Sequence, residues 1–282
     1  MLSQATTDLI GRALAEDIGL RDVTTEAVVP PGTRAFGRID QKAPGVLFGL
    51  EVAEAVFRRL DQLVGWRPMR PEGEWLDEPP ALVAELEGDA RALLTGERVA
   101  LNFLQRLSGI ATATASCVEL LQGSGVEVLD TRKTTPGLRE LEKQAVAAGG
   151  GRNHRMGLND AMLVKDNHIA LAGGVREAVR RAIDRRAPGM PVEVECTSLA
   201  DVAEALEAGA THLLLDNMAV DQMREARALA GSEAVLEASG GITPASLRSL
   251  RDAGLQFVSL GFLTHSASAL DLSMSIKPVE AP

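Results

Sequence analysis

The stretch HLLLDNMAVDQMREARALAGSEAVLEASGG, residues 212–241, decides the fold. An apolar run at 212–216 is followed by a helical pattern at 220–230 and by a second apolar run at 234–238. A strand, a helix and a strand in this order form a βαβ unit, in which the helix crosses over one face and the strands pair in parallel. We therefore expect a parallel sheet here.

The same alternation continues on both sides of this unit. Apolar runs also occupy residues 126–130, 161–164, 192–195 and 257–261, and helical patterns occupy 175–186, 199–208 and 245–253. The later runs begin about 20 to 23 residues apart, which is enough for a strand, a turn and a helix of two or three turns. Repeated units of this kind indicate an α/β fold with a buried parallel sheet. Both a doubly wound sheet and a complete or incomplete (β/α) barrel fit the pattern.

The first hundred residues have a different, mixed pattern. Apolar spacing predicts helices over 2–16 and 52–63, strands over 34–40 and 46–50, and a loop over 68–80. The segment ALVAELEGDARALL, residues 81–94, alternates on both sides of Gly88-Asp89 and predicts a β-hairpin. A long helix is expected over 97–121, with a break or a kink near Gly109.

Charge and composition limit the classes of protein to consider. The net charge of −10 argues against nucleic acid as the main partner, because phosphate binding favours a basic surface. No apolar run approaches the roughly 20 residues that cross a bilayer, and acidic residues stand where a secretory signal would be apolar. Cys117 and Cys196 suggest neither a disulfide framework nor a metal site. These features predict a soluble cytoplasmic protein that does not bind membranes.

Polar and glycine residues stand at the carboxyl ends of the apolar runs. In parallel α/β folds these ends form the functional face. Two ends are cationic, two are carboxylates and two are rich in glycine. The residues concerned are Thr131, Arg132, Lys133, Lys165, Glu195, Asp216, Ser239, Gly240, Gly241 and Gly261.

A cationic segment precedes and follows the second run, within GGGRNHRMGLNDAMLVKDNH, residues 149–168. Its basic and imidazole side chains are Arg152, His154, Arg155, Lys165 and His168. Isolated buried charges each cost several kcal/mol, so these cations either face water or surround an anion. Arginine binds carboxylates and phosphates bidentately, which favours a ligand with at least two anionic groups. Lys165 alone would also suit a Schiff-base aldolase, but such a lysine usually needs an apolar pocket.

The carboxylate and glycine ends each allow two interpretations. Glu195 and Asp216 could hold Mg²⁺ together with substrate oxygens, or could balance the charge of Lys165 or Arg132. Gly240-Gly241 could expose backbone N–H groups to a phosphate, or could form a plain turn. Thr243 and Pro244 after the glycines fit the N-cap and first turn of a helix.

With these residues considered, the chain resembles the quinolinate phosphoribosyltransferase family over nearly its whole length. The matching segments follow the family's order. They are EDIGLRDVTT (16–25), GERVALNFLQRLSGIAT (96–112), DTRKTTPGLR (130–139), residues 149–168, VEVE, LLLDN, EASGGI and GFLTHS. The departures are Leu20-Arg21, where a more glycine-rich turn is common, and the absence of tyrosine. Neither departure concerns the site.

The resemblance implies an α/β protein with two domains. An N-terminal α/β sandwich, residues 1–103, would be completed by the tail 267–282 and followed by an incomplete, TIM-like (β/α) barrel at 104–266. The barrel's C-terminal face would join quinolinate to phosphoribosyl pyrophosphate with the help of Mg²⁺, releasing pyrophosphate and CO₂ and forming nicotinate mononucleotide for de novo NAD biosynthesis. A homodimer is also implied, with Arg98 reaching into the partner's site.

The resemblance further assigns roles to residues. Glu195 and Asp216 would hold the ribose hydroxyls and the metal, and Lys133, Lys165, Glu195 and Asp216 would be catalytic. Thr131, Arg132, Lys133, His154, Arg155 and Lys165 would line the quinolinate pocket. Ser239, Gly240, Gly241, Leu260, Gly261 and Phe262 would hold the 5-phosphate through backbone donors.

Two rival functions stay open. A molybdenum-transport-associated relative of the family lacks the combination of Asn153-His154-Arg155 with Lys165-Asp166-Asn167-His168, and this chain has both. A non-catalytic anion-binding barrel would have no need of Glu195 and Asp216, which are present. Both comparisons favour the quinolinate enzyme.

Overall fold

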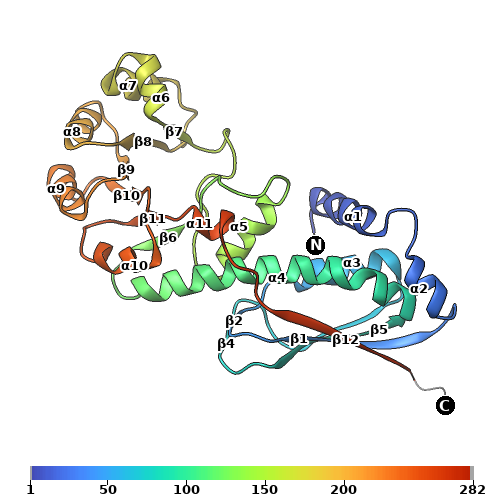
Figure 1. Ribbon diagram of the computed structural model, residues 1–282. Coiled ribbons are helices and arrows are strands. Elements are labelled where there is room, and N and C mark those ends of the chain that lie inside the picture. The colour runs from blue at the N-terminus through green and yellow to red at the C-terminus, as the bar shows by residue number, and fades with distance from the viewer. Residues whose placement is uncertain (1, 280–282) are drawn as a thin grey trace. The chain divides into compact units, whose positions relative to one another are not determined.

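A computed structural model describes residues 2–279, and backbone contacts divide the chain into two compact units (Figure 1). The first unit extends to Ala115 and includes Thr135–Gly150 and the segment from Ser266 onward. The second unit consists of Ser116–Thr134 and Gly151–His265. The last three residues of the expected C-terminal tail, 280–282, lie outside the described part of the chain.

The first unit contains an antiparallel sheet of four strands in the order β12-β1-β5-β3. Alternate residues of β1, including Ala35 and Ile39, are buried, as expected for a sheet with one face on a core. The small sheet β2-β4 accompanies it. The strands are β1 (Arg34–Gln41), β2 (Gly45–Val46), β3 (Gly65–Pro68), β4 (Trp75–Leu76), β5 (Ala81–Asp89) and β12 (Leu272–Pro278). The helices of this part are α1 (Gln4–Ile18), α2 (Val23–Val28), α3 (Leu50–Leu60), α4 (Ala90–Leu121), which continues into the second unit, and α5 (Arg139–Ala148).

The predicted hairpin around Gly88-Asp89 is wrong. Strand β5 ends at Asp89 and α4 begins at Ala90. The Asp89 carboxylate accepts a hydrogen bond from the amide of Ala92 at 3.0 Å, so this residue caps a helix and does not turn a hairpin.

The predicted break at Gly109 is also absent, because α4 is one continuous helix of 32 residues. A Cβ atom at Gly109 would lie 2.0 Å from the carbonyl oxygen of Ser268. Glycine is therefore needed here for the close approach of another backbone segment, and the helix runs through it.

Two further expectations in the first unit need correction. The strand expected over 46–50 is only the two residues of β2, because Gly49 takes a left-handed conformation with φ of 109° and Leu50 begins α3. The Glu72 carboxylate accepts from the amides of Gly49 and Leu50, each at 2.6 Å. The loop expected over 68–80 contains β4, which pairs with β2.

The second unit is built on a parallel sheet of six strands in the order β6-β11-β10-β9-β8-β7 (Figure 1). In the described part of the chain no pairing joins β6 to β7, so the sheet is an open, incomplete barrel. The strands are β6 (Glu127–Leu129), β7 (Met162–Val164), β8 (Val192–Cys196), β9 (His212–Asp216), β10 (Val235–Ser239) and β11 (Phe257–Ser259). The predicted α/β fold class is confirmed.

Helices follow the strands of the second unit, as the βαβ pattern predicts. The helix expected over 245–253 is shorter: α10 ends at Leu247 and continues only as a 3₁₀ turn, Arg248–Leu250. The helices are α6 (Asp166–Ala172), α7 (Val175–Arg185), α8 (Leu199–Glu207), α9 (Val220–Ala230), α10 (Pro244–Leu247) and α11 (Phe262–His265). In the part of the chain that the structure describes, every helix is too short or too polar to cross a membrane.

Candidate active site

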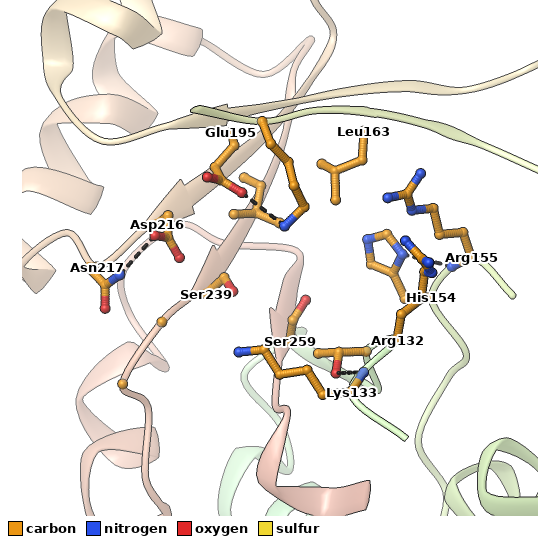
Figure 2. Close-up of a pocket in the computed structure, with 15 residues that line it drawn as sticks. Arg132, Lys133, His154, Arg155, Leu163, Glu195, Asp216, Asn217, Ser239 and Ser259 are labelled. Atoms are coloured by element: carbon orange, nitrogen blue, oxygen red, sulfur yellow. Dashed lines mark hydrogen bonds and ion pairs between the residues drawn. The ribbon is translucent and has the colours of Figure 1, made fainter. Parts of the chain in front are cut away.

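A cavity of about 420 Å³ lies at the carboxyl ends of the strands of the second unit (Figure 2). Most of the residues expected in the site share this cavity. Those that line it are Thr131, Arg132, Lys133, His154, Arg155, Lys165, Glu195, Asp216, Ser239, Gly240 and Gly241. Figure 2 shows the carboxylates Glu195 and Asp216 on one side and Arg132, His154 and Arg155 on the other.

On the cationic side of the cavity, the two arginines influence each other's charge. Burial and the neighbouring Arg132 guanidinium lower the pKa of Arg155, and the Glu193 carboxylate acts in the opposite direction. The Arg155 guanidinium also donates to the carbonyl oxygen of Ala161 at 3.1 Å. The charges of Arg132 and Arg155 thus repel each other, and a bound dianion would relieve this repulsion.

The carboxylate side comes from two neighbouring strands. Glu195 on β8 accepts from the Lys165 ammonium at 3.2 Å, and Asp216 ends β9. The Asn217 amide donates to the Asp216 carboxylate at 2.8 Å. Carboxylates at adjacent strand ends, open to substrate oxygens, form a donor set that suits Mg²⁺. Charge balance with Lys165, the alternative considered for Glu195, is present in the same arrangement.

A second cavity of about 320 Å³ adjoins the first and contains the glycine-rich strand ends. Gly240, Gly241, Gly261 and Phe262 line it. Their N–H groups donate to no acceptor within residues 2–279, so these groups are available to a bound anion. Thr243 is the N-cap of α10 and Pro244 its first residue, as predicted.

Gly240 cannot be replaced without moving Asn217. Its φ of 86° is a left-handed conformation, and a Cβ atom there would lie 2.4 Å from Asn217 Oδ1. Asn217 has a φ of 56°, and its amide N–H donates to the carbonyl oxygen of Ser239 at 2.9 Å. The turn after β9 and the turn after β10 therefore fit against each other without space for a side chain.

Leu260 does not fit the donor role expected of it. Its amide donates to the carbonyl oxygen of Leu129 at 3.0 Å, which leaves no proton for a phosphate. Its side chain is buried, and Leu260 lines neither cavity. Leu260 therefore does not belong to the phosphate donors.

Arg98 belongs to the first unit, whereas both cavities are lined by the second. It is an exposed residue of α4. Its role in a partner's site stays a prediction.

Three buried acidic residues, here called the acidic layer, were not predicted from the sequence as part of the site. Glu193 and Glu237 are buried on β8 and β10, and Asp130 is fully buried after β6. The Asp130 carboxylate accepts from the amide of His154 at 2.9 Å and from the Asn153 side chain at 2.7 Å. The signal was available, because Glu193 stands two positions before Glu195 and so shares its face of the strand.

Two other polar residues of the cavity were not singled out in the sequence. Asn217 and Ser259 both line it. Ser259 is buried, and its hydroxyl has no hydrogen-bond partner within the described residues. Cys117 and Cys196 are buried core residues, as expected, and burial raises the pKa of their thiols to about 11 and about 12 respectively.

Family models match almost the entire chain. The model described as quinolinate phosphoribosyl transferase, C-terminal domain, matches residues 110–275, and that of the N-terminal domain matches residues 22–108.

Individual relatives agree with the family models. The probable nicotinate-nucleotide pyrophosphorylase [carboxylating] of Bacillus subtilis is 42% identical over 268 residues, covering 95% of this chain and 92% of the relative. The nicotinate-nucleotide pyrophosphorylase [carboxylating] of Homo sapiens is 44% identical over 240 residues, covering 83% and 80%. The crystal structure of NadC from Streptococcus pyogenes superposes with a TM-score of 0.94 at 41% identity and covers 99% of both chains.

Proposed function

The chain belongs to the quinolinate phosphoribosyltransferase family, and from this premise we propose that the two adjoining cavities of its second unit are the active site. Its activity is that of the carboxylating nicotinate-nucleotide pyrophosphorylases, type II phosphoribosyltransferases of NAD biosynthesis. Its substrates are quinolinate and phosphoribosyl pyrophosphate.

One observation carries the assignment of the site. Guanidinium groups and exposed backbone amides occur at the same sheet end, and in the strand order the carboxylates of β9 and β8 stand between the glycines after β10 and Lys165 after β7. Arg132 and Arg155 suit a dicarboxylate, because each can bind a carboxylate through two parallel hydrogen bonds. The free amides of Gly240 and Gly241 suit the 5-phosphate of the second substrate. Glu195 and Asp216 then bind the hydroxyls of the ribose.

The reaction needs positioning more than proton transfer. Arg132, Arg155 and Lys165 orient the pyridine so that its nitrogen faces C1 of the ribose, and the glycine amides hold the sugar from its other end. The bond from C1 to the pyrophosphate oxygen breaks while the bond from the ring nitrogen forms. Charge develops on C1 as it becomes oxocarbenium-like, and the carboxylates of Glu195 and Asp216 stabilise it.

The second half of the reaction is the loss of CO₂. The quaternised ring nitrogen withdraws electrons and stabilises the negative charge left at C2 when the adjacent carboxylate departs. Lys133 and Lys165 line the cavity beside this position, and we assign to them the binding of the carboxylates and the compensation of this charge. A proton from solvent completes the product at C2.

We assign Mg²⁺ to Glu195 and Asp216, because their hard oxygen donors fit this ion. When bound, Mg²⁺ would supply positive charge that lowers the barrier to the departure of pyrophosphate. The homodimer with Arg98 in the partner's site and the cytoplasmic location stay predictions.

Substrate choice is tested by turnover. The protein is given phosphoribosyl pyrophosphate and Mg²⁺ with quinolinate or with nicotinate, and nicotinate mononucleotide is measured in both. We expect product and an equal amount of CO₂ from quinolinate, and loss of both after removal of the metal with EDTA. Product from nicotinate only, or from neither acid, would contradict the assignment.

The pocket itself is tested by Arg155→Ala. Loss of its bidentate contact is expected to raise KM for quinolinate by about tenfold to a hundredfold while KM for phosphoribosyl pyrophosphate changes little. Arg152→Ala is the matched control, because this nearby arginine is exposed, pairs with Glu127 at 2.5 Å and does not line the cavity. Equal effects of the two substitutions would reject the pocket.

A further inference from the structure

The acidic layer lies on the same strand faces as the active site. Glu193 precedes Glu195 by two positions on β8, and Glu237 precedes Ser239 by two on β10. Because side chains alternate along a strand, each glutamate points to the side on which Glu195 or Ser239 lines the cavity. Only 9% of the surface of Glu193 and 4% of that of Glu237 is exposed, so both are nearly dry.

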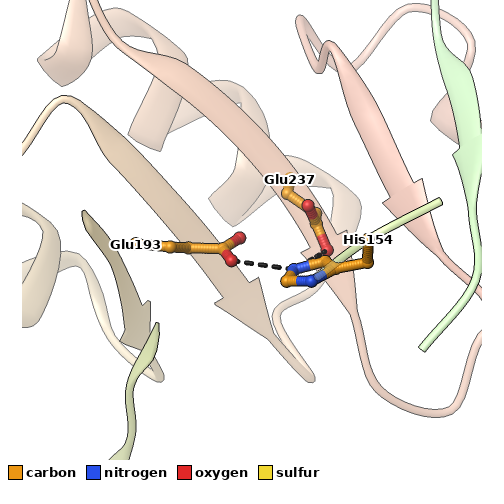
Figure 3. Close-up of side chains that lie close together, drawn as sticks. All are labelled: His154, Glu193 and Glu237. Atoms are coloured by element: carbon orange, nitrogen blue, oxygen red, sulfur yellow. Dashed lines mark hydrogen bonds and ion pairs between the residues drawn. The ribbon is translucent and has the colours of Figure 1, made fainter. Parts of the chain in front are cut away.

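Both glutamates approach one imidazole ring (Figure 3). Nε2 of His154 lies 2.9 Å from Glu193 Oε2 and 3.8 Å from Glu237 Oε1. The other ring nitrogen, Nδ1, accepts a hydrogen bond from the amide of Arg155 at 2.7 Å. Since Nδ1 accepts, the ring proton is on Nε2 and is donated to Glu193. The carboxylate therefore sets both the tautomer and the direction of the ring.

These three side chains could also be considered as metal ligands, because their donor atoms lie within 4.8 Å of one another. A metal would need the lone pair of Nε2, and in the observed hydrogen-bond pattern this nitrogen carries the proton. Burial raises the pKa of Glu237 well above its usual range. The charge of Glu193 and a hydrogen bond with Glu193 act in the same direction. A neutral carboxyl group is a hydrogen-bond donor and a poor ligand, so the cluster fits proton sharing better than metal binding.

The acidic layer also acts on the neighbouring arginine. The negative charge of Glu193 favours the charged guanidinium of Arg155, against the effects of burial and of Arg132. His154 and Arg155 both line the cavity. One buried carboxylate is thus connected to two adjacent residues of the pocket, to one by a hydrogen bond and to the other by charge.

Packing alone does not require acids at these positions. Leu214, on the strand between β8 and β10, pairs in register with Glu237 and lines the cavity of about 420 Å³. Replacement of buried ionic groups by apolar residues of similar volume is often neutral or stabilising. Interaction with His154 and Arg155 therefore explains the two carboxyl groups better than the filling of space in the core does.

We infer that Glu193 and Glu237 are positioning residues for the dicarboxylate substrate: Glu193, with Glu237 beside the same imidazole ring, holds the His154 ring and the Arg155 guanidinium in the arrangement that receives the pyridine. This inference rests on the proposed function, because it takes the cavity to be the quinolinate pocket. Neither glutamate is assigned a contact with the substrate.

The sign of the effect separates positioning from simple charge. If the buried charge only repelled the dianion, its removal would lower KM for quinolinate. If it positions His154 and Arg155, its removal raises that KM. Glu193→Leu removes the acceptor and keeps the volume, whereas Glu193→Gln keeps an oxygen that can accept from Nε2.

We expect Glu193→Leu to raise KM for quinolinate by about tenfold or more, the scale of a lost hydrogen bond to a charged group, and to change KM for phosphoribosyl pyrophosphate less than about twofold. Glu193→Gln recovers most of the loss. The control is Glu127→Gln, a strand carboxylate with a basic partner, Arg152, outside both cavities. Thermal melting and ¹⁵N spectra of the histidine rings accompany the kinetics, and the tautomer signal of His154 should change in Glu193→Leu.

A double-mutant cycle with His154→Ala completes the test. Where His154 is already absent, Glu193→Leu should add much less to KM for quinolinate than it does alone. Full additivity, an unchanged or lowered KM, or equal increases for both substrates would overturn the inference. If His154→Ala itself leaves KM for quinolinate unchanged, the assignment of the pocket fails first, and the inference fails with it.

Discussion

Gly240 shows how a backbone conformation at one residue supports the phosphate end of the site. Its positive φ and its contact with Asn217 leave no space for a Cβ atom. Asn217 in turn donates to Asp216, so a displaced Asn217 would disturb a proposed metal ligand as well.

Gly240→Ala is expected to raise KM for phosphoribosyl pyrophosphate by at least about tenfold, because the strain of a positive φ adds to the clash with Asn217. Steady-state kinetics measure the change in KM, and thermal melting measures the loss of stability. Gly189→Ala is the control, since Gly189 has a φ of 78° and no atom within 4 Å of the added Cβ. It should lower Tm slightly and leave both KM values unchanged. Equal kinetic effects of the two variants would show that the contact with Asn217 does not matter.

Residues at the strand ends could be predicted because their position follows from a simple rule. Lys165, Glu195 and Asp216 each end an apolar run, and all three line the cavity. Glu193 and Glu237 stand inside such runs, and the sequence pattern alone predicts only that they belong to a buried strand. Their partner, His154, is distant in sequence, so only the folded chain shows what these buried carboxylates contact.

At the scale of elements, Gly109 reverses the usual effect of glycine in a helix. Gly→Ala in a helix interior normally stabilises by up to about 1 kcal/mol. In α4 the added methyl group would lie 2.0 Å from the backbone oxygen of Ser268, next to the segment that leads into β12.

Gly109→Ala is therefore expected to lower the free energy of unfolding by about 1–3 kcal/mol, the usual scale of overpacking. Gly11→Ala in α1 is the comparison, because its Cβ would meet only the end of Arg59 at 3.5 Å. That variant should be unchanged or slightly more stable. Denaturant midpoints measure both, and stabilisation by Gly109→Ala would show that the Ser268 segment moves away at little cost.

An ion pair joins α4 to α5 within the first unit, and its carboxylate is fully buried whereas the Arg106 side chain is 27% exposed. Glu142 is fully buried and accepts from Arg106 at 2.9 Å and from the hydroxyl and amide of Thr135 at 2.8 Å and 3.0 Å. Removing Glu142 leaves the partly buried charge of Arg106 without its carboxylate.

Glu142→Ala should lower the free energy of unfolding by about 3 kcal/mol or more. Glu54→Ala, which breaks the exposed pair of Glu54 with Arg58 in α3, should change it by about 0.5 kcal/mol or less. Both values come from denaturant unfolding at neutral pH. A small loss in Glu142→Ala would mean that water reaches Arg106 readily.

The wrong predictions of secondary structure have identifiable physical reasons. Gly88-Asp89 has the composition of a hairpin turn, but Asp89 caps α4, and propensity does not distinguish these uses. Gly109 looks like a break until Ser268, distant in sequence, is known to pack against it. The βα units of the second unit were predictable because each consists of local patterns repeated along the chain.

At the scale of the whole molecule, the domain division stays a prediction. The boundary expected at 103/104 falls inside α4, whose residues up to Ala115 belong to the first compact unit. The segment Thr135–Gly150 belongs to the same unit, although it stands between parts of the second. The chain thus crosses between units several times, which a boundary drawn once along the sequence does not represent.

The predicted sharing of Arg98 between subunits can be tested by mixing two inactive variants. Arg98→Ala and Lys133→Ala each remove a cation proposed for the quinolinate site, and both residues are exposed, so neither substitution should harm folding. In a mixed dimer one site receives both substitutions and the other receives neither, because the two residues would come from different chains. Random mixing in equal amounts should therefore restore about a quarter of the wild-type activity, since half of the dimers are mixed and each has one intact site. No recovery, with subunit exchange demonstrated by two different affinity tags, would place Arg98 and Lys133 in the same chain's site or remove Arg98 from the site altogether.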